Sequence, residues 1–173
     1  DWLEELIGVA SQPGVGAVGP MLLYPDKTIQ HAGVVLGMNT MAGHVFRGRI
    51  PGEWTDFGLP DWPRNYLAVT GACLMIARDI YNKMGGLDEE FTIAGNDVAL
   101  GIKLHESGYR NVYWPFVSLI HYENVSVGSY DNVPQKDFDH SLTYYKNYLG
   151  TYDPYYNINL DLMNERVGRK GRL

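Results

Sequence analysis

Apolar residues recur along the chain with helical spacing in some segments and as unbroken runs in others. Trp2, Leu6 and Val9 have helical spacing, so a helix is predicted over residues 1–11 with these side chains facing the core. Two apolar runs then predict buried strands, and Pro20 predicts a bend or an edge position in the first of them. These two predicted strands cover residues 15–24 and 29–36.

The middle of the chain alternates between apolar runs and helical patterns, as expected for an α/β fold. The apolar run 67–76 predicts a strand that is buried on both faces. Asn96 is a good N-cap for the longer of the two helices that follow. Pro115 divides the next apolar stretch into two short strands. The predicted elements after the run are helices 78–84 and 96–107, strands 112–114 and 117–120, and a final helix 134–149.

The last part of the chain has one amphipathic pattern and a basic end. Phe138, Leu142, Tyr145 and Leu149 have helical spacing and are predicted to dock the final helix onto the core. The basic tail over residues 164–173 is predicted to fray.

A long segment, residues 37–65, is rich in glycine and proline and is predicted to have little regular structure. Loops of this length in compact domains are usually functional or disordered, and the aromatic residues here favour a binding loop. Arg47, Trp62 and Arg64 are its candidates for holding a phosphate and a sugar ring. A solvated loop with scattered cations explains the same residues equally well.

The composition excludes several classes of protein. The 173 residues are 45% hydrophobic and 13% aromatic, which is enough for one globular domain with a sizeable core. A formal net charge of -6 argues against nucleic acid as a partner. A single cysteine cannot form an internal disulfide, which favours a reducing compartment. The chain has no apolar run of about 18 residues, so no membrane span is predicted.

Four motifs, taken in order, resemble one known family. VTGACLMIARD is followed by MGGLDEEF, then by NDVALGIKLHESGYR and LIHYENVSVG. These segments are similar to the strand with TGA, the GGFDE segment, the acid-led helix with GYR and the HxE turn of family-two, GT-A-type inverting glycosyltransferases. The flanking segments VGAVGPMLLYPDKTIQHAGVVLG and DPYYNINL extend the resemblance over nearly the whole chain.

The resemblance implies an α/β fold in which a mixed sheet is flanked by helices. This fold is the C-terminal, acceptor-side half of a GT-A nucleotide-diphospho-sugar transferase. Residues 1–173 would form a single partial domain, because the family's nucleotide-binding half and its Asp-x-Asp motif precede the segment that resembles the first helix. We expect such a piece to be inactive alone and to self-associate through apolar surface at the cut edge of the sheet.

The resemblance places the chemistry on Asp97. In the family an acid at this helix start deprotonates the acceptor hydroxyl, which then attacks the anomeric carbon with inversion. A helix N-terminus stabilises a carboxylate, and that effect alone also explains an acid here. The chain departs from the family at Asn96, where many members have Glu, and at Ala99, where a second acid is common. Gly101, one turn along, is predicted to leave room for the acceptor.

His121 is the candidate metal ligand, at the predicted end of a strand. In the family a residue in this region helps to hold a divalent cation, Mg²⁺ or Mn²⁺, that bridges the donor diphosphate. Glu123 is predicted to orient the His121 ring. The alternative is a structural histidine whose ring is satisfied by hydrogen bonds. That alternative is preferred for His31, which lies within a predicted strand.

Gly71 and Ala72 belong to the small-residue segment that lines the substrate cleft in the family, with Asn96 beside it. Small residues allow a ligand or another backbone to approach closely, although ordinary strand packing explains them as well. Asp137 and Asp139 match the letters of the family's metal-binding acid pair. Residues two apart on a helix do not face each other, so that pair is rejected as a metal site.

The parent protein is accordingly predicted to transfer a sugar from a nucleotide-sugar donor to a glycan or lipid-linked acceptor in bacterial cell-surface polysaccharide synthesis. That activity implies a cytoplasmic location at the inner face of the membrane. The alternative is a non-catalytic carbohydrate-binding or interaction module that uses the aromatic loop. An Asp-x-Asp motif upstream of Asp1 in the parent gene would favour the enzyme.

Overall fold

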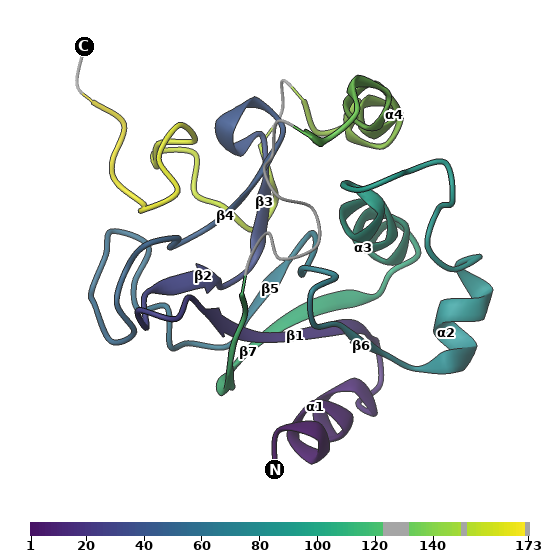
Figure 1. Ribbon diagram of the computed structural model, residues 1–173, viewed down its shortest axis with the longest axis horizontal. Helices are drawn as coiled ribbons and strands as arrows, with labels where there is room; N and C mark the ends of the chain where they lie inside the picture. Colours follow the sequence, from purple (N-terminus) through teal and green to yellow (C-terminus); the bar gives the residue numbers. More distant parts are fainter. Residues whose placement is uncertain (123–131, 150–151, 172–173) are drawn as a thin grey trace.

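The computed structural model describes residues 1–122, 132–149 and 152–171. In this part of the chain a mixed sheet is flanked by helices, so the α/β fold predicted from the sequence is confirmed (Figure 1). None of the described helices is long and apolar enough to cross a bilayer. The described α-helices match the predicted ones to within a few residues. They are α1 (Trp2–Ala10), α2 (Arg78–Lys83), α3 (Asn96–Glu106) and α4 (Gln135–Tyr145).

Strand β1 (Val15–Leu23) lies at the centre of the sheet and has partners along both edges. On one side β7 (Arg110–Ile120) runs parallel to β1, and β5 (Arg64–Tyr66) lies antiparallel beyond β7. The other edge of β1 is shared by β2 (Ile29–His31) and β6 (Met75–Ile76), both antiparallel to it. This central position explains why β1 is an almost continuous apolar run, as the sequence predicted.

Pro20 lies at a break in the register between β1 and β7. It is aligned with Trp114, whereas its successor is aligned with Ser118, so residues 115–117 bulge out of the ladder. Because Pro115 has no N–H to donate, the bulge places it where no ladder hydrogen bond is required. The register break falls at Pro20, where a bend or an edge position was predicted. The prediction of two short strands is wrong, since β7 continues through the bulge.

Helices α1 and α3 cover opposite faces of β1 (Figure 1). Leu6 of α1 shares a buried apolar cluster with Val18 of β1. Leu100 of α3 shares another cluster with Ala17, the neighbouring strand residue, whose side chain points to the other face. This packing fixes the orientation of α3, whose first turn carries Asp97.

One surface of α1 carries exposed apolar side chains. Trp2, predicted to face the core, is 48% exposed, because only the later turns of α1, with Leu6 and Val9, are buried. Leu3 and Ile7 are exposed as well, so they form an apolar surface with Trp2 on this helix. Exposed apolar surface of this kind favours association.

Self-association was predicted at the cut edge of the sheet and stays a prediction, and the exposed surface of α1 is a further candidate for the contact. Replacing Ile7 by Lys should shift a concentrated sample toward the monomer in sedimentation velocity, because a charge opposes apolar contact. Thermal unfolding should be unchanged, since Ile7 is 46% exposed and contributes little to the core. A wild-type chain that stays monomeric at every concentration would contradict the prediction.

Residues 29–36, predicted as one strand, form two strands of different sheets. After β2 the chain continues as β3 (Val34–Leu36), which pairs with β4 (Ala42–His44) in a separate two-stranded sheet. The direction changes at Gly33, which has a φ of 116°. A Cβ added there would lie 2.2 Å from the Tyr66 ring, so only glycine fits.

The segment 37–65 is less irregular than predicted. It contains a 3-10 turn, η1 (Met38–Thr40), and the strand β4. Val45 and Phe46 are completely buried in the largest apolar cluster. The prediction failed because it relied on the glycine and proline content of the segment, whereas its apolar side chains anchor the first part of it to the core.

The apolar run 67–76 does not form the single strand predicted for it. β5 ends at Tyr66, immediately before the run. Only the last two residues of the run, Met75 and Ile76, form a strand of the sheet, β6. Helix α3 packs directly on the run, since a Cβ added to Gly101 would lie 2.6 Å from the Leu67 carbonyl oxygen. Gly101 therefore permits this close packing, and the prediction that it leaves room for an acceptor is wrong.

Helix α4 docks only partly as predicted, since Tyr145 is buried and Leu149 packs against the same apolar cluster. Asp137, Ser141 and Tyr145 are buried, whereas Phe138 and Leu142 are 37% and 43% exposed. The buried face accepts the polar Asp137 because its carboxylate has hydrogen-bond partners in a neighbouring loop.

The segment after α4 packs on the largest apolar cluster, so the prediction of a frayed tail is wrong for its described part. Leu160 and Val167 are buried in that cluster. Asp153 joins the segment to β3, because its Oδ2 accepts the N–H of Leu36 at 2.9 Å. Burial raises the pKa of Asp153 to about 6, although the N–H groups of Leu36 and Tyr155 favour its charged form.

Stability should fall with rising pH because of Asp153. Its folded-state pKa of about 6 lies above the ordinary value of 3.8. The stabilising effect is therefore complete below about pH 4 and is lost as the pH rises through about 6. Replacing Asp153 by Asn should remove this contribution, on the order of 3 kcal/mol. Urea unfolding at several pH values measures it, and identical pH dependences for the two proteins would contradict the prediction.

Candidate active site

A pocket of about 570 Å³ lies between the start of α3, the buried face of α4 and the turn at residues 70–72. A volume of this size is typical of small-molecule sites. Strand residues Gln30 and His44 line it as well. The pocket brings together five residues that the sequence predicted as site residues: Gly71, Ala72, Asn96, Asp97 and His121.

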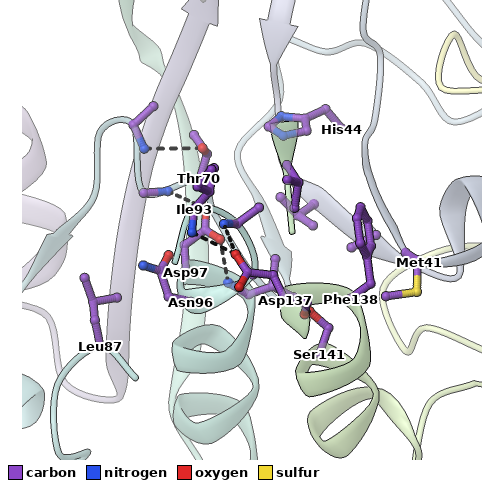
Figure 2. Close-up of a pocket in the computed structure, with 18 of the residues that line it drawn as sticks. Met41, His44, Thr70, Leu87, Ile93, Asn96, Asp97, Asp137, Phe138 and Ser141 are labelled. Carbon is purple, nitrogen blue, oxygen red and sulfur yellow. Dashed lines mark hydrogen bonds between the residues drawn. The ribbon is translucent and has the colours of Figure 1, made fainter. Parts of the chain in front are cut away.

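Asp97 lies in the first turn of α3 and is fixed by two backbone N–H groups. Its Oδ2 accepts the N–H of Gly71 at 2.7 Å, and its Oδ1 accepts the N–H of Val98 at 2.8 Å. Figure 2 shows Asp97 below Thr70 and beside the Asp137 side chain that comes from α4. A carboxylate has about four lone-pair positions, so each oxygen retains capacity to accept a further hydrogen bond. Asp97 is held in place and can still bind a ligand hydroxyl.

The N-cap of α3 is Gly95, and the prediction of Asn96 at that position is wrong. Gly95 has a φ of 107°, and a Cβ there would lie 2.6 Å from the Phe91 ring and 2.7 Å from the Ser141 hydroxyl. Asn96 is consequently the first helical residue, and it lines the pocket. The tight turn brings the helix N-terminus to the pocket wall, where the helix dipole stabilises a negative charge.

The turn at residues 70–72 is anchored from two sides. Asp97 binds the N–H of Gly71 from the side of α3, and His31 Nε2 lies 3.4 Å from the N–H of Thr70 on the other side. A Cβ added to Gly71 would lie 3.2 Å from the Cβ of Asp97. Gly71 therefore allows the Asp97 carboxylate to reach the backbone of the turn.

His31 and His44 form a pair behind this turn, with their Nδ1 atoms 3.0 Å apart. His31 is completely buried, and burial, together with the neighbouring His44 and His121, holds its pKa well below the ordinary value. In neutral His31, Nε2 accepts a hydrogen bond from the Thr70 N–H. Nδ1 of His31 therefore carries the proton and donates a hydrogen bond to Nδ1 of His44. The ring of His31 thus links β2, β4 and the turn, which supports the structural role preferred for it from the sequence.

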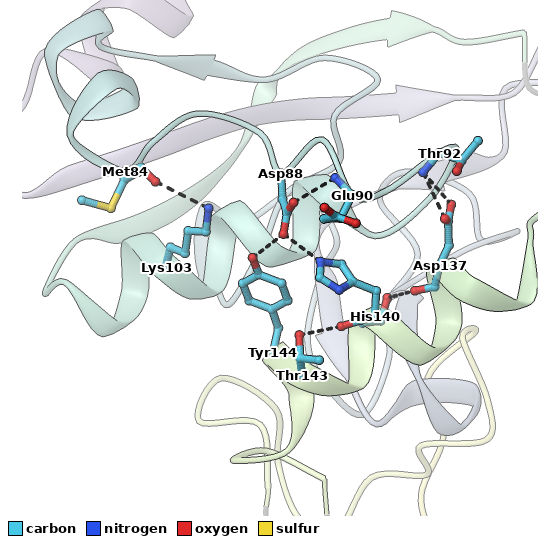
Figure 3. A network of polar contacts seen from close by, with 10 residues as sticks. Met84, Asp88, Glu90, Thr92, Lys103, Asp137, His140, Thr143 and Tyr144 are labelled. Atoms are coloured by element: carbon cyan, nitrogen blue, oxygen red, sulfur yellow. Dashed lines mark hydrogen bonds and ion pairs between the residues drawn. The ribbon is translucent and has the colours of Figure 1, made fainter.

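Asp137 fixes the loop that leads into α3. It is 1% exposed, and its carboxylate accepts the N–H groups of Thr92, Ile93 and Ala94 at 2.7 to 3.2 Å. Figure 3 shows the Asp137 carboxylate directed from α4 at the backbone of Thr92. Although burial opposes the shift, these three hydrogen bonds hold the pKa of Asp137 below its ordinary value.

A second carboxylate, Asp88, ties the same loop to α4 (Figure 3). It accepts hydrogen bonds from the Tyr144 hydroxyl and from His140 Nε2, and these contacts hold the pKa of Asp88 well below its usual range. Burial and the bond to Asp88 raise the pKa of Tyr144 to about 12. Asp88 and Asp137 therefore hold both ends of loop 88–94, and we call these two carboxylates and their contacts the α4 latch.

Arg47, Trp62 and Arg64 are not among the residues that line the pocket. Arg47 donates to the Tyr24 hydroxyl at 2.7 Å, and Arg64 donates to the carbonyl oxygen of Phe57 at 2.7 Å. Trp62 is 45% exposed. The structure does not bring these three residues together with Asp97, so a role for them in substrate binding stays a prediction.

His121 follows β7, and its backbone N–H donates to the Leu23 carbonyl oxygen at 2.9 Å. Its ring Nδ1 is buried without a hydrogen-bond partner among the described residues. Glu123, predicted to orient the ring, lies outside the described residues. In the part of the chain that the structure describes, no three His, Cys, Asp or Glu side chains gather as metal ligands. These residues alone do not build an Mg²⁺ or Mn²⁺ site, to which His121 offers one ligand.

Sequence reasoning missed Gln30, His44 and Asp137 as residues of the pocket. Asp137 was considered only as half of a metal-binding pair, and its carboxylate is instead occupied by backbone N–H groups. A signal was present for Gln30, because an amide side chain in an apolar strand needs a polar partner. No sequence signal marked Asp137, because its partners are backbone N–H groups, which every residue except proline has.

The fold and the pocket define a mixed α/β domain with a carboxylate at a helix start in a pocket of about 570 Å³. No protein-family model matches the chain. The chain is 45% identical over 164 residues to O-antigen biosynthesis protein RfbC of Myxococcus xanthus, covering 93% of the chain and 13% of that protein. It is 43% identical over 171 residues to the uncharacterized protein y4gI of Sinorhizobium fredii, covering 94% of the chain and 18% of that protein.

A more distant relative has an enzyme name. The chain is 26% identical over 145 residues to N-acetylglucosaminyl-diphospho-decaprenol L-rhamnosyltransferase of Mycobacterium tuberculosis. That alignment covers 73% of the chain and 44% of the enzyme. The chain therefore spans less than half the length of each of these three relatives.

Proposed function

We propose that the chain is the acceptor-side part of an inverting, GT-A-type glycosyltransferase. Its parent transfers a sugar from a nucleotide-sugar donor to a hydroxyl of a glycan or lipid-linked acceptor in cell-surface polysaccharide synthesis. The observation that carries the proposal is Asp97, a carboxylate held at a helix N-terminus in a pocket of about 570 Å³. The relatives named for O-antigen biosynthesis and for rhamnosyl transfer support it.

Asp97 acts in this proposal as the general base. The acceptor O–H gives its proton to a carboxylate oxygen of Asp97 while the acceptor oxygen forms a bond to the anomeric carbon. The bond from that carbon to the diphosphate oxygen breaks on the opposite face, and the nucleoside diphosphate leaves with the electron pair. The hydrogen bonds from Gly71 and Val98 keep the carboxylate oriented throughout.

The predicted Mg²⁺ or Mn²⁺ stays a proposal for the parent protein. His121 would supply one ligand through a ring nitrogen, and the remaining ligands come from outside the described residues of this chain. No step above depends on the cation. The proposed activity implies a cytoplasmic location at the inner face of the membrane.

A transfer assay on the parent protein tests the proposal. The protein is incubated with UDP-sugars and dTDP-sugars and with a set of glycan and lipid-linked acceptors, and products are identified by mass spectrometry. NMR of the product then gives the anomeric configuration. An inverted linkage supports the proposal, whereas a retained configuration, or no transfer from any donor, contradicts it.

A non-catalytic carbohydrate-binding module is the second candidate, and two exposed tryptophans favour it. Trp54 and Trp62 are 67% and 45% exposed, and their rings meet edge to face with centroids 5.5 Å apart. Large aromatic side chains with exposed faces are suited to contact with a sugar ring. Glycan binding that is lost in Trp54→Ala, in a parent that lacks an Asp-x-Asp motif and any transfer activity, would support the module.

A further inference from the structure

Two polar atoms of residues that line the pocket are buried without a hydrogen-bond partner among the described residues. They are Oε1 of Gln30 and Nδ1 of His121. Gln30 is only 5% exposed, so its side chain is largely shielded from bulk solvent. Buried polar groups are nearly always paired, because an unpaired group loses its hydration without compensation. Two unpaired atoms at one pocket therefore indicate a ligand that pairs with both.

The strand pairing places Gln30 and His121 on either side of the end of β1. Leu23 of β1 is aligned with Ile29 on one side and with Ile120 on the other, and each partner immediately precedes one of the two residues. Neighbouring strands lie about 4.8 Å apart, so the two backbones are separated by about 10 Å. Since both residues line the pocket, one small ring can contact both side chains.

The two atoms define the chemistry of the ligand. An amide oxygen such as Oε1 of Gln30 only accepts, so its partner must carry an O–H or N–H. A fully ionised phosphate or a carboxylate has no proton to donate and therefore does not pair with this oxygen. Nδ1 of His121 donates or accepts according to its tautomer, and a hydroxyl does both. Two hydroxyls of one ring therefore satisfy both atoms.

The contacts of the next residue fix the backbone at Gln30, and other pocket residues supply an apolar wall. The next residue, His31, is completely buried and is fixed by its contacts with Thr70 and His44. A fixed acceptor loses little freedom when a ligand binds, which favours selectivity. Val34 and Met41 line the same pocket and offer apolar contact to the C–H face of a ring.

We infer that Gln30 and His121 form a subsite that binds a neutral sugar ring through its hydroxyls, with Gln30 accepting a hydrogen bond from one of them. The inference rests on the proposed function, because it names the substrate contacts of the same pocket. It assigns Gln30 to sugar selectivity, whereas Asp97 carries the proton transfer.

Saturation-transfer NMR on the 173-residue chain tests the subsite. The probes are the methyl glycosides of glucose, galactose and mannose, together with their per-O-methylated forms, which keep the ring but have no hydroxyl to donate. At least one methyl glycoside should bind, and its per-O-methylated form should not. Gln30→Met keeps the length of the side chain without the amide and should weaken binding about tenfold. The matched control Gln12→Met changes an exposed glutamine outside the pocket and should bind like wild type.

Thermal unfolding separates a binding role from a structural one. Because Oε1 of Gln30 has no partner among the described residues, Gln30→Met should leave Tm unchanged or raise it. A clear fall in Tm would assign Gln30 to the fold and overturn the inference. Equal binding of the per-O-methylated probes, unweakened binding by Gln30→Met, or failure of every methyl glycoside to bind would overturn it as well.

The same data distinguish failure of this inference from failure of the proposed function. If a parent protein without transfer activity still binds sugar through Gln30, the subsite is supported and the proposed glycosyltransferase activity is contradicted. If the parent protein transfers sugar and Gln30→Met binds sugar as tightly as wild type, only the subsite is contradicted.

Discussion

Replacing Asp97 by Asn should slow sugar transfer by the parent protein by about 100- to 10,000-fold. An amide keeps the shape of the carboxylate and still accepts the N–H of either Gly71 or Val98. It cannot remove the proton from an acceptor hydroxyl, so the loss should appear in kcat rather than in acceptor binding. The free energy of unfolding should fall by only about 1 kcal/mol, because Gly95 provides the N-cap of α3.

Asp79→Asn is the matched control for this substitution. Asp79 is an exposed acid in the first turn of α2, outside the pocket, so it has the same helix-start position without the proposed chemistry. The control should transfer sugar at the wild-type rate. If Asp97→Asn is folded and also transfers at that rate, Asp97 is a helix-start acid that only holds the turn at residues 70–72.

Replacing Asp137 by Ala should lower the free energy of unfolding by about 2 to 4 kcal/mol. The substitution removes the acceptor of three consecutive backbone N–H groups, those of Thr92, Ile93 and Ala94. Urea denaturation measures the loss of stability. Hydrogen exchange should accelerate at these three amides, and Asp137→Asn should fall between wild type and Ala because it keeps one acceptor oxygen.

Asp139→Ala tests whether the effect belongs to the α4 latch or to helix α4 alone. Asp139 lies two residues further on the same helix, is exposed and bonds the side chain of Gln135. Its replacement should change stability by less than about 0.5 kcal/mol. Equal losses for the two variants, or unchanged exchange at residues 92–94 in Asp137→Ala, would show that Asp137 does not hold the loop.

The sequence predicted the elements whose signals are local. Helical spacing identified α1, a glycine pair at 85–86 identified the end of α2, and a continuous apolar run identified β1 at the centre of the sheet. Placing Gly71, Asp97 and His121 at one pocket required the family resemblance, because nothing in their spacing shows that they meet.

The features that the sequence did not predict depend on contacts between distant residues. The separation of β2 from β3 depends on the Tyr66 ring, which leaves space only for Gly33. The buried face of α4 depends on Asp137 meeting a loop more than 40 residues earlier in the chain. Apolar periodicity alone therefore placed Tyr145 in the core correctly but placed Phe138 there wrongly.

Within the α4 latch, Asp137 binds only the main chain of the loop, so it places no demand on the side chains at positions 92–94. Any residue except proline at position 92, 93 or 94 keeps the N–H that Asp137 binds. Ile93 is 36% exposed and forms part of the pocket wall. Evolution or protein engineering can therefore replace the Ile93 side chain and change the pocket wall while the loop stays hydrogen-bonded to Asp137.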